Sequence, residues 1–282
     1  MGAPMAVNLV NAGFSVRCYN RTPGKTAPVT DAGGAAFDTP REAAQGADII
    51  ISCVTNGPDV EAILFGDDGA QSGAKAGALF VDMSTIAPAV AVSIGKKLRA
   101  KGLRFLEAPV TGGTLGATKG TLNILAAGQR ADFDQALPAL QAMGGKITFC
   151  GGPGAGQGVK LCNQIMGAMN LLGVCEALVL CGKMGIEGDV LVEALNGGAA
   201  TSWALQNLAP QINQGDYSPG FMVDTQQKDM GLVMEAAGQV QASLPGAALA
   251  TQLWRASQAA GDGEEGVHAM FKVLAKMAQL QD

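Results

Sequence analysis

The sequence has very little histidine and few aromatic side chains. Among 282 residues there is one histidine, His268, and aromatic residues make up only 5%. This leaves little room for a Ser-His-Asp triad or a histidine-rich metal site, so we predict no metal ligands. We expect His268 to be structural, and any acid–base chemistry then falls to lysine, a carboxylate, tyrosine or cysteine.

The sequence also has few charged residues and no paired cysteine motif. Charged residues make up 15%, the net charge is −5 and no basic run is visible, which argues against a nucleic-acid partner. The longest uncharged apolar run, 161–175, is shorter than the ~20 residues of a membrane-spanning helix, and no secretory signal is visible. The six cysteines form no C-x-x-C pair, so we expect buried reduced thiols in a cytoplasmic protein without a membrane partner.

Hydrophobic residues make up 48%, enough for the large cores of about two domains. We predict strands at 15–20, 35–37, 47–54, 78–85, 104–110, 121–128 and 146–150, and helices at 1–12, 58–65 and 88–101 between them. This alternation predicts a parallel sheet of βαβ units. Only helices follow: 156–184, 188–195, 203–212, 225–242, 246–260 and 266–280. The fold class is therefore α/β, with a Rossmann-type parallel sheet domain at 1–152 and an all-α domain at 153–282.

The stretch 151–170 stands out. Five glycines in eight residues lead into a long apolar helix with Lys160 in its first turns. One helical face then carries Lys160, Asn163, Gln164, Gly167 and Asn170. We expect the other faces, with Met166 and Met169, to be buried. Burying an unpaired ammonium is costly, so Lys160 should meet a partner, a cleft or a ligand; the alternative is a surface lysine at a helix start.

Polar residues follow several predicted strands. In a doubly wound sheet, ligands bind at the carboxyl ends of the strands. The first strand ends in Asn20-Arg21-Thr22, and an arginine here accommodates a 2′-phosphate, which favours NADP over NAD and leaves NAD possible. Thr55-Asn56-Gly57 and Ser84-Thr85 end two later strands. They either line a nicotinamide nucleotide or form ordinary turns.

The glycine fingerprint of dinucleotide binding, G-x-G-x-x-G, is represented only by its tail. Gly2 fits the third glycine, and the strand that should precede it is absent from the sequence. We therefore expect an N-terminally shortened chain. Such a chain should be less stable and should bind the pyrophosphate poorly.

Five segments together resemble a known family. They are 1–13, VDMST (81–85), EAPVTGGTLGATKGTL (107–122), GAGQGVKLCNQ (154–164) and QKDM (227–230). Their order and spacing over essentially the whole chain resemble the β-hydroxyacid dehydrogenases. That family includes 3-hydroxyisobutyrate dehydrogenase, tartronate semialdehyde reductase (2-hydroxy-3-oxopropionate reductase) and the glyoxylate and succinic semialdehyde reductases.

The resemblance implies a role for each matching residue. Lys160 matches the catalytic lysine, which gives a proton to the carbonyl oxygen as hydride arrives at carbon; desolvation should lower its pKa toward the working pH. The implied substrate-binding residues are Thr111, Gly112, Gly113, Asn163 and Gln164. The implied cofactor-binding residues are Gly2, Asn20, Arg21, Thr22, Val54, Thr55, Asn56, Thr85, Lys228 and Asp229.

Two details narrow the implied function. Gln164 stands where many hydroxyisobutyrate dehydrogenases have asparagine, and it resembles the tartronate semialdehyde reductases. The Asn-Arg-Thr turn resembles the NADP-using reductases. We therefore expect an NAD(P)-dependent reductase that converts a small, carboxylate-bearing semialdehyde or 3-oxo acid to the hydroxy acid.

Two other functions stay open. One is an NAD-dependent 3-hydroxyisobutyrate dehydrogenase, and the other is a non-catalytic binding protein on the same fold. For any of the three, an all-α domain this apolar suggests a homodimer or homotetramer.

Overall fold

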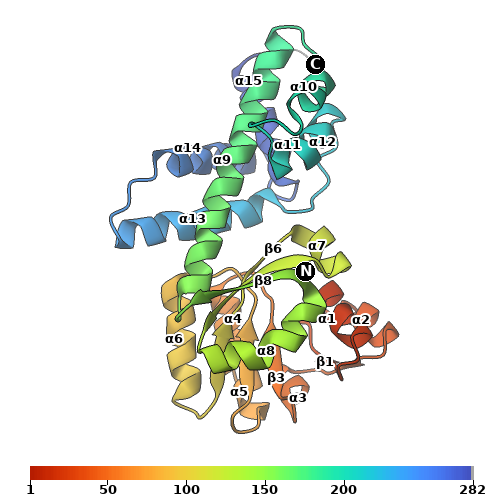
Figure 1. Cartoon of the computed structure of the whole chain (residues 1–282), viewed down its shortest axis with the longest axis vertical. Helices are drawn as coiled ribbons and strands as arrows, with labels where there is room; N and C mark the ends of the chain where they lie inside the picture. The colour runs from red at the N-terminus through yellow and green to blue at the C-terminus, as the bar shows by residue number, and fades with distance from the viewer. Residues whose placement is uncertain (281–282) are drawn as a thin grey trace. The chain divides into compact units, whose positions relative to one another are not determined.

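The computed structural model describes residues 1–280, and its contacts divide the chain into two units, Met1–Lys160 and Leu161–Asp282. The division falls inside the longest helix, α9 (Ala155–Lys183) (Figure 1). The first unit alternates strands and helices, and the second is helical. The predicted fold class, a Rossmann-type sheet domain followed by an all-α domain, is confirmed.

A six-stranded sheet forms the centre of the first unit. Its order is β3-β4-β5-β7-β6, with β8 paired to β7. The strands are β3 (Ile49–Ser52), β4 (Leu79–Asp82), β5 (Arg104–Glu107), β6 (Val110–Thr111), β7 (Leu122–Gly128) and β8 (Gly144–Gly151). β3, β4 and β5 are parallel, whereas β7 runs antiparallel to β5 and β6, a change of direction that the strand pattern did not predict. Antiparallel neighbours can be joined by short connections, and only ten residues, 112–121, separate β6 from β7.

Two short strands, β1 (Arg17–Cys18) and β2 (Ala35–Ala36), form a separate parallel pair and are shorter than predicted. The helices of the first unit are α1 (Gly2–Asn11), α2 (Ala27–Asp31), α3 (Pro40–Ala44), α4 (Gly57–Phe65), α5 (Ala70–Gly73), α6 (Pro88–Arg99), α7 (Gly113–Lys119) and α8 (Arg130–Met143). They cover both faces of the sheet, which explains why all four residues of β4 are buried (Figure 1). Leu79 and Val81 pack with α1 and α8, and the alternate residue Phe80 packs with α4 and α6.

One hydrophobic core holds the second unit together, and Trp254, Met230 and Cys175 are at its centre. Its further helices are α10 (Gly188–Leu195), α11 (Trp203–Asn207), α12 (Ala209–Asn213), α13 (Val223–Gln239), α14 (Pro245–Ala259), η1 (Val267–Ala269) and α15 (Met270–Met277). The helix predicted at 203–212 is two helices, because Pro210 lies in the first turn of the second one. His268 is buried, with its Nε2 2.8 Å from the carbonyl oxygen of Asp216, so its role is structural.

The burial of α9 differs from the sequence prediction. Lys160 and Gln164, on the predicted polar face, are each only 6% exposed, whereas Met166 is 67% exposed and Met169 is also exposed. The expectation that both methionines are buried is therefore wrong. All six cysteines are free thiols, as expected, but only Cys175 is buried. Cys162 is exposed and the other four are partly exposed, so the prediction of buried thiols is confirmed only for Cys175.

By length and composition, α9 is apolar enough to cross a membrane, and among residues 1–280 it is alone in this. A third of the most apolar 18-residue stretch of this helix is buried within the protein. The uncharged apolar run 161–175 covers only part of this helix, which has 29 residues. One such helix is weak evidence of a membrane protein, because a core helix passes the same test.

Candidate active site

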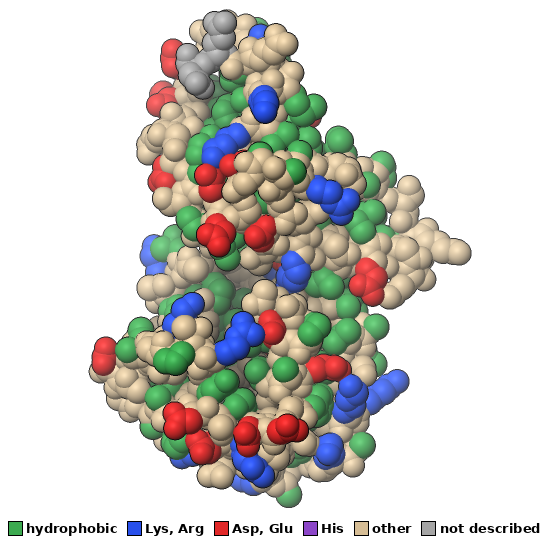
Figure 2. Space-filling view, turned by 180° about the vertical axis from the view of Figure 1, so that it is seen from behind, with side chains coloured by type: hydrophobic (Ala, Val, Ile, Leu, Met, Phe, Trp, Pro, Cys, Tyr) green, Lys and Arg blue, Asp and Glu red, His purple; other side chains and the backbone are tan. Residues whose placement is uncertain are grey.

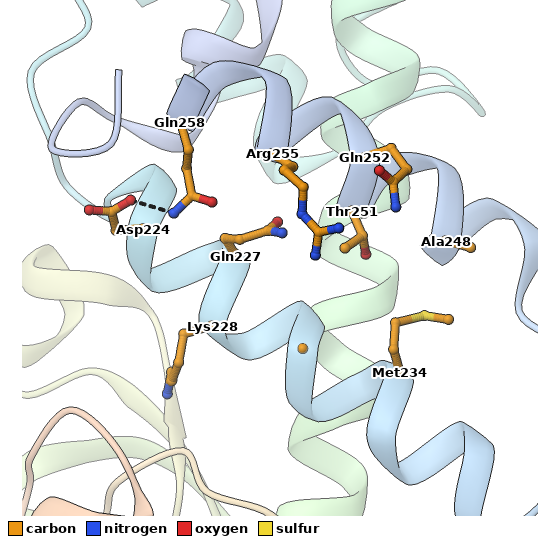
Figure 3. A pocket seen from close by; sticks show the side chains of 10 residues that line it. Asp224, Gln227, Lys228, Met234, Ala248, Thr251, Gln252, Arg255 and Gln258 are labelled. Atoms are coloured by element: carbon orange, nitrogen blue, oxygen red, sulfur yellow. Dashed lines mark hydrogen bonds between the residues drawn. The ribbon is translucent and has the colours of Figure 1, made fainter. Parts of the chain in front are cut away.

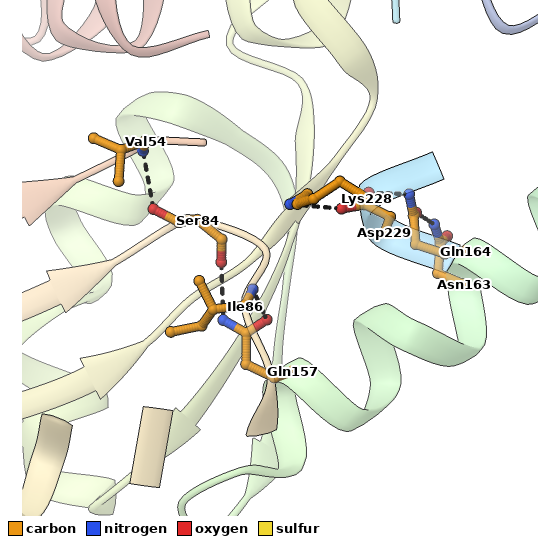
Figure 4. Close-up of polar contacts among 8 residues, drawn as sticks. All are labelled: Val54, Ser84, Ile86, Gln157, Asn163, Gln164, Lys228 and Asp229. Carbon is orange, nitrogen blue, oxygen red and sulfur yellow. Dashed lines mark hydrogen bonds and ion pairs between the residues drawn. The ribbon is translucent and has the colours of Figure 1, made fainter. Parts of the chain in front are cut away.

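The first turn of α9 is attached to two strand ends of the sheet. Glu107, the last residue of β5, accepts a hydrogen bond from the backbone N–H of Gly156 at 2.8 Å. Gln157 is fully buried; its Nε2 donates to the carbonyl oxygen of Ser84 at 2.8 Å and its Oε1 accepts from the N–H of Ile86 at 3.2 Å (Figure 4). The buried Lys160 follows one turn later. Its position in the first unit is therefore set by groups at the carboxyl ends of β4 and β5.

A second set of polar contacts joins the ends of β3 and β4. Ser52 and Ser84 each donate a hydroxyl hydrogen bond to Asp82 Oδ1, at 2.7 and 2.8 Å. The N–H of Val54 donates to Ser84 Oγ at 2.9 Å (Figure 4). These contacts bring together the turns that hold the predicted cofactor residues Val54 and Thr85.

The first helix begins at the same edge of the sheet. A Cβ placed on Gly2 would lie 3.9 Å from the carbonyl oxygen of Cys53, just beyond β3. A helix N-terminus offers unpaired N–H groups and a positive dipole end, which suits a phosphate. Burial raises the pKa of the neighbouring Cys53 thiol to about 11, so this thiol is neutral at physiological pH.

The turn after β1 is polar and open to solvent. Asn20 Oδ1 accepts a hydrogen bond from the N–H of Thr22 at 3.0 Å, which fixes the turn. The side chain of Arg21 is 81% exposed and lies 3.4 Å from Asp59. Asn56 caps α4, because its Oδ1 accepts from the N–H of Asp59 at 2.8 Å. Asn56 therefore has a capping role in this turn, and its neighbour Thr55 is exposed in the same turn.

The predicted substrate segment ends a strand and begins a helix. Thr111 ends β6, and α7 begins at Gly113. Gly112 and Gly113 have φ of 127° and 62°, values that L side chains rarely adopt. The two glycines therefore let the backbone turn sharply, with amide groups uncovered by side chains.

Four predicted residues form one hydrogen-bonded chain within the second unit. Asn163 Nδ2 donates to Gln164 Oε1 at 2.9 Å, and Gln164 Nε2 donates to Asp229 Oδ2 at 2.5 Å. The other oxygen of Asp229 is paired with Lys228 Nζ at 2.7 Å (Figure 4). Asp229 is buried. The chain of contacts joins α9 to α13 and fixes the direction of Lys228.

A cavity of about 610 Å³ lies between α13 and α14 of the second unit. Gln227 and Lys228 of α13 and Thr251 and Arg255 of α14 line it. The side chains of Gln227 and Arg255 point toward each other, whereas that of Lys228 points away from α14 (Figure 3). No role was predicted for the α14 residues from the sequence. No group of three His, Cys, Asp or Glu side chains that could hold a metal occurs within residues 1–280.

The sequence did not indicate three features of the site, although Glu107, Gln157 and Asp82 all lie inside the motifs described above. They are the buried carboxylate Glu107, the buried Gln157, and the serine pair on Asp82. Glu107 and Asp82 are acidic residues at the ends of apolar strands. This position is the sequence signal that could have marked them as buried site residues. Gln157, between Gly156 and Gly158, carries no such signal.

Two family models together match nearly the whole chain. The NAD-binding domain of 6-phosphogluconate dehydrogenase matches residues 1–152. The model described as NAD-binding of NADP-dependent 3-hydroxyisobutyrate dehydrogenase matches residues 154–274. The chain belongs to the β-hydroxyacid dehydrogenase family. The family resemblance inferred from the sequence is therefore confirmed, and the chain is an oxidoreductase with a nicotinamide cofactor.

Relatives within this family act on different hydroxy acids. The chain is 35% identical to 2-(hydroxymethyl)glutarate dehydrogenase of Eubacterium barkeri, over 98% of this chain and 92% of the relative. It is 37% identical to the NAD-dependent L-serine dehydrogenase of Pseudomonas aeruginosa, over 97% and 94%. A solved structure of Mycobacterium tuberculosis 3-hydroxyisobutyrate dehydrogenase with L-serine is similar at a TM-score of 0.88 and 32% identity, over 97% of this chain and 95% of that one.

Proposed function

We propose that the protein is a reductase that converts a small semialdehyde or 3-oxo acid to the hydroxy acid, with NADP preferred and Lys160 as general acid. The observation that carries the proposal is the buried position of Lys160, 6% exposed, in a glycine-rich segment at the start of α9. Lysine is seldom buried without a function or a partner. General acid catalysis by a positioned side chain contributes about 10²–10⁴ in rate.

The residues at the carboxyl edge of the sheet fit a nicotinamide dinucleotide. The start of α1 at Gly2 suits the pyrophosphate, and the exposed Arg21 suits a 2′-phosphate. We assign the turns at Val54–Thr55 and Thr85 to the nucleotide, and Lys228 and Asp229 are the proposed cofactor residues of the second unit. The bound nicotinamide supplies the hydride.

The chain's own residues handle the substrate and the proton. The N–H groups at Gly112 and Gly113, with the hydroxyl of Thr111, bind the substrate carboxylate. Asn163 and Gln164 hydrogen-bond the substrate, and Asp229 orients Gln164. The Lys160 ammonium donates a proton to the carbonyl oxygen of the substrate. In the oxidative direction the neutral amine takes the hydroxyl proton back.

The second candidate is an NAD-dependent 3-hydroxyisobutyrate dehydrogenase, and the structural similarity to the mycobacterial enzyme of that name favours it. Initial rates with NADPH and NADH on tartronate semialdehyde and succinic semialdehyde test the first candidate. Rates with NAD and NADP on 3-hydroxyisobutyrate, L-serine and 2-(hydroxymethyl)glutarate test the second. The substrate and cofactor with the highest kcat/KM decide between them.

A matched pair of variants tests the role of Lys160. Lys160→Ala should lower kcat by about 10³-fold or more, because the proton donor is lost. Lys183→Ala, which removes an exposed lysine at the other end of α9, should leave kcat unchanged. Full activity of Lys160→Ala would refute the assignment, and no turnover by the unaltered chain across both panels would favour the non-catalytic binding protein.

The protein also presents large apolar side chains on one helix face, which supports a homodimer or homotetramer. The face of α9 with Met166, Met169 and Leu180 is exposed, and so is Met184 directly after the helix. Further apolar side chains lie at the surface of the face drawn in Figure 2. Contiguous exposed apolar patches mark interaction sites, and a second copy of the chain is the proposed partner. Light scattering should give a dimer or tetramer mass that Leu180→Glu reduces; a monomer mass for the unaltered chain would contradict the proposal.

A further inference from the structure

We propose that Gln157 and Glu107 form a two-point anchor that positions Lys160 relative to the turns after β3 and β4. The inference rests on the proposed function, in which Lys160 moves the proton. Neither anchor residue is expected to touch the substrate or the reacting atoms. Both act through the helix that carries Lys160, so they are positioning residues.

Gln157 binds the turn after β4 on both sides of Thr85. Its amide donates to the carbonyl oxygen of Ser84 and accepts from the N–H of Ile86, so both ends of the amide are used. Lys160 lies three residues further, about 4.5 Å along the helix axis. Because a hydrogen-bonded helical turn moves as a unit, the position of Gln157 determines that of Lys160.

Glu107 holds the same turn from the end of β5. Its carboxylate accepts from the N–H of Gly156 at 2.8 Å and is only 1% exposed. The N–H groups at the start of a helix have no partner within the helix, and a carboxylate there is favoured by the helix dipole. Glu107 therefore serves as a buried cap contributed by the sheet.

The third side of this turn lies directly against β7. A Cβ added to Gly156 would lie 2.5 Å from the carbonyl oxygen of Leu125 and 3.3 Å from the Cβ of Ala127. Only glycine allows this approach. The contact with β7 and the hydrogen bonds of Glu107 and Gln157 together fix the position of the first turn of α9.

The anchor also reaches the turn after β3. Ser84, whose carbonyl oxygen accepts from Gln157, uses its hydroxyl to bind the N–H of Val54 and the carboxylate of Asp82. Gln157 thus joins the helix of Lys160 to both strand turns that are proposed to line the cofactor. A misplacement of about 1 Å in such an arrangement can cost about 100-fold in rate.

Substitutions of Gln157 test the anchor. Gln157→Met keeps the length of the side chain and removes both hydrogen bonds; Gln157→Glu keeps the acceptor for Ile86 and places an oxygen opposite the Ser84 carbonyl. We expect kcat to fall by about 100-fold in both, with the substrate KM within about threefold. The deuterium isotope effect on kcat, measured with deuterated reduced cofactor, should increase because hydride transfer becomes slower.

Two further variants separate positioning from folding. Glu107→Leu should lower kcat similarly, and Glu107→Gln, which keeps an acceptor oxygen, should recover most of that loss. Gln141→Met, on the exposed side of α8, is the matched control and should behave as the unaltered protein. All rates are taken with the best substrate of the panels above and per folded protein, determined by circular dichroism.

The outcomes distinguish this inference from the proposed function. If Lys160→Ala is inactive while Gln157→Met and Glu107→Leu retain kcat within threefold, the anchor is refuted and the function stands. If Lys160→Ala retains full activity, the proposed function fails and the anchor has nothing to position. If Gln157→Met does not fold, Gln157→Glu and the two Glu107 variants decide on the same readouts.

Discussion

Glu107→Gln should make the protein more stable at neutral and alkaline pH. Burial is the largest cause that raises the pKa of the Glu107 carboxyl from 4.5 to about 7; the charge of Asp82 also raises it, and the N–H groups of Gly156, Gln157 and Gly154 partly offset the rise. At about 1.4 kcal/mol for each tenfold change in the ionisation constant, this difference corresponds to about 3 kcal/mol. The neutral glutamine has the same shape and avoids this cost.

The pH range in which stability changes follows from the raised pKa of Glu107. Between pH 4.5 and 7 the folded protein binds a proton on Glu107 that the unfolded chain has lost, so folding stability falls as pH rises through this window. Above pH 7 both states are ionised and the loss is complete. The advantage of Glu107→Gln should therefore be near zero at pH 4.5 and reach about 3 kcal/mol at pH 8. Cys150 also faces this carboxylate, and its thiol pKa is raised, so it stays neutral in the window.

Urea unfolding at pH 5 and pH 8, followed by circular dichroism, measures the difference. Because the chain has two units, unfolding is not described by one global free energy. We therefore compare the urea midpoint of the pH-dependent transition between Glu107→Gln and the unaltered protein. Glu61→Gln is the control: this half-exposed surface glutamate pairs with Lys97, and such pairs contribute less than about 1 kcal/mol. Equal shifts at the two pH values, or no stabilisation at pH 8, would refute the reasoning.

Three further predictions concern other sites. Gly156→Ala should destabilise the first unit by about 1–3 kcal/mol through overpacking against the Leu125 carbonyl; an unchanged urea midpoint would contradict the close approach. Arg21→Ala should weaken NADPH binding about tenfold or more and leave NADH binding unchanged, as measured by fluorescence titration, because hydrogen bonds to charged groups contribute about 1.5–3 kcal/mol; equal losses for both nucleotides would mean that Arg21 does not read the 2′-phosphate. Burial lowers the pKa of His268 below 6.5, so the unfolded chain binds the proton first and stability should fall as pH drops below 6.5. Urea midpoints at pH 7.5 and 5.5 for the protein and for His268→Gln test this, and an equal pH dependence in both would contradict it.

Local patterns in the sequence determined most of the secondary structure and the family. The apolar run at 78–85 contains a fully buried strand, and the predicted helix 156–184 differs from α9 by one residue at each end. Both predictions depend only on neighbouring residues, because burial on two faces gives a continuous apolar run and helical periodicity repeats every 3.6 residues. The glycine-rich and lysine motifs were also local, which is why they identified the family without a structure.

Other features depended on the tertiary structure. Periodicity does not give strand direction, so the antiparallel β7 was missed. Hydropathy does not say what covers a helix face, so the exposure of Met166 was not predicted. The contacts of Gln157 with the turn after β4 and of Gln164 with Asp229 join residues 65 to 73 positions apart. The sequence by itself therefore determined which residue types the site contains, and chain folding decided which of them meet, because distant hydrogen bonds depend on the order and direction of the strands and helices between them.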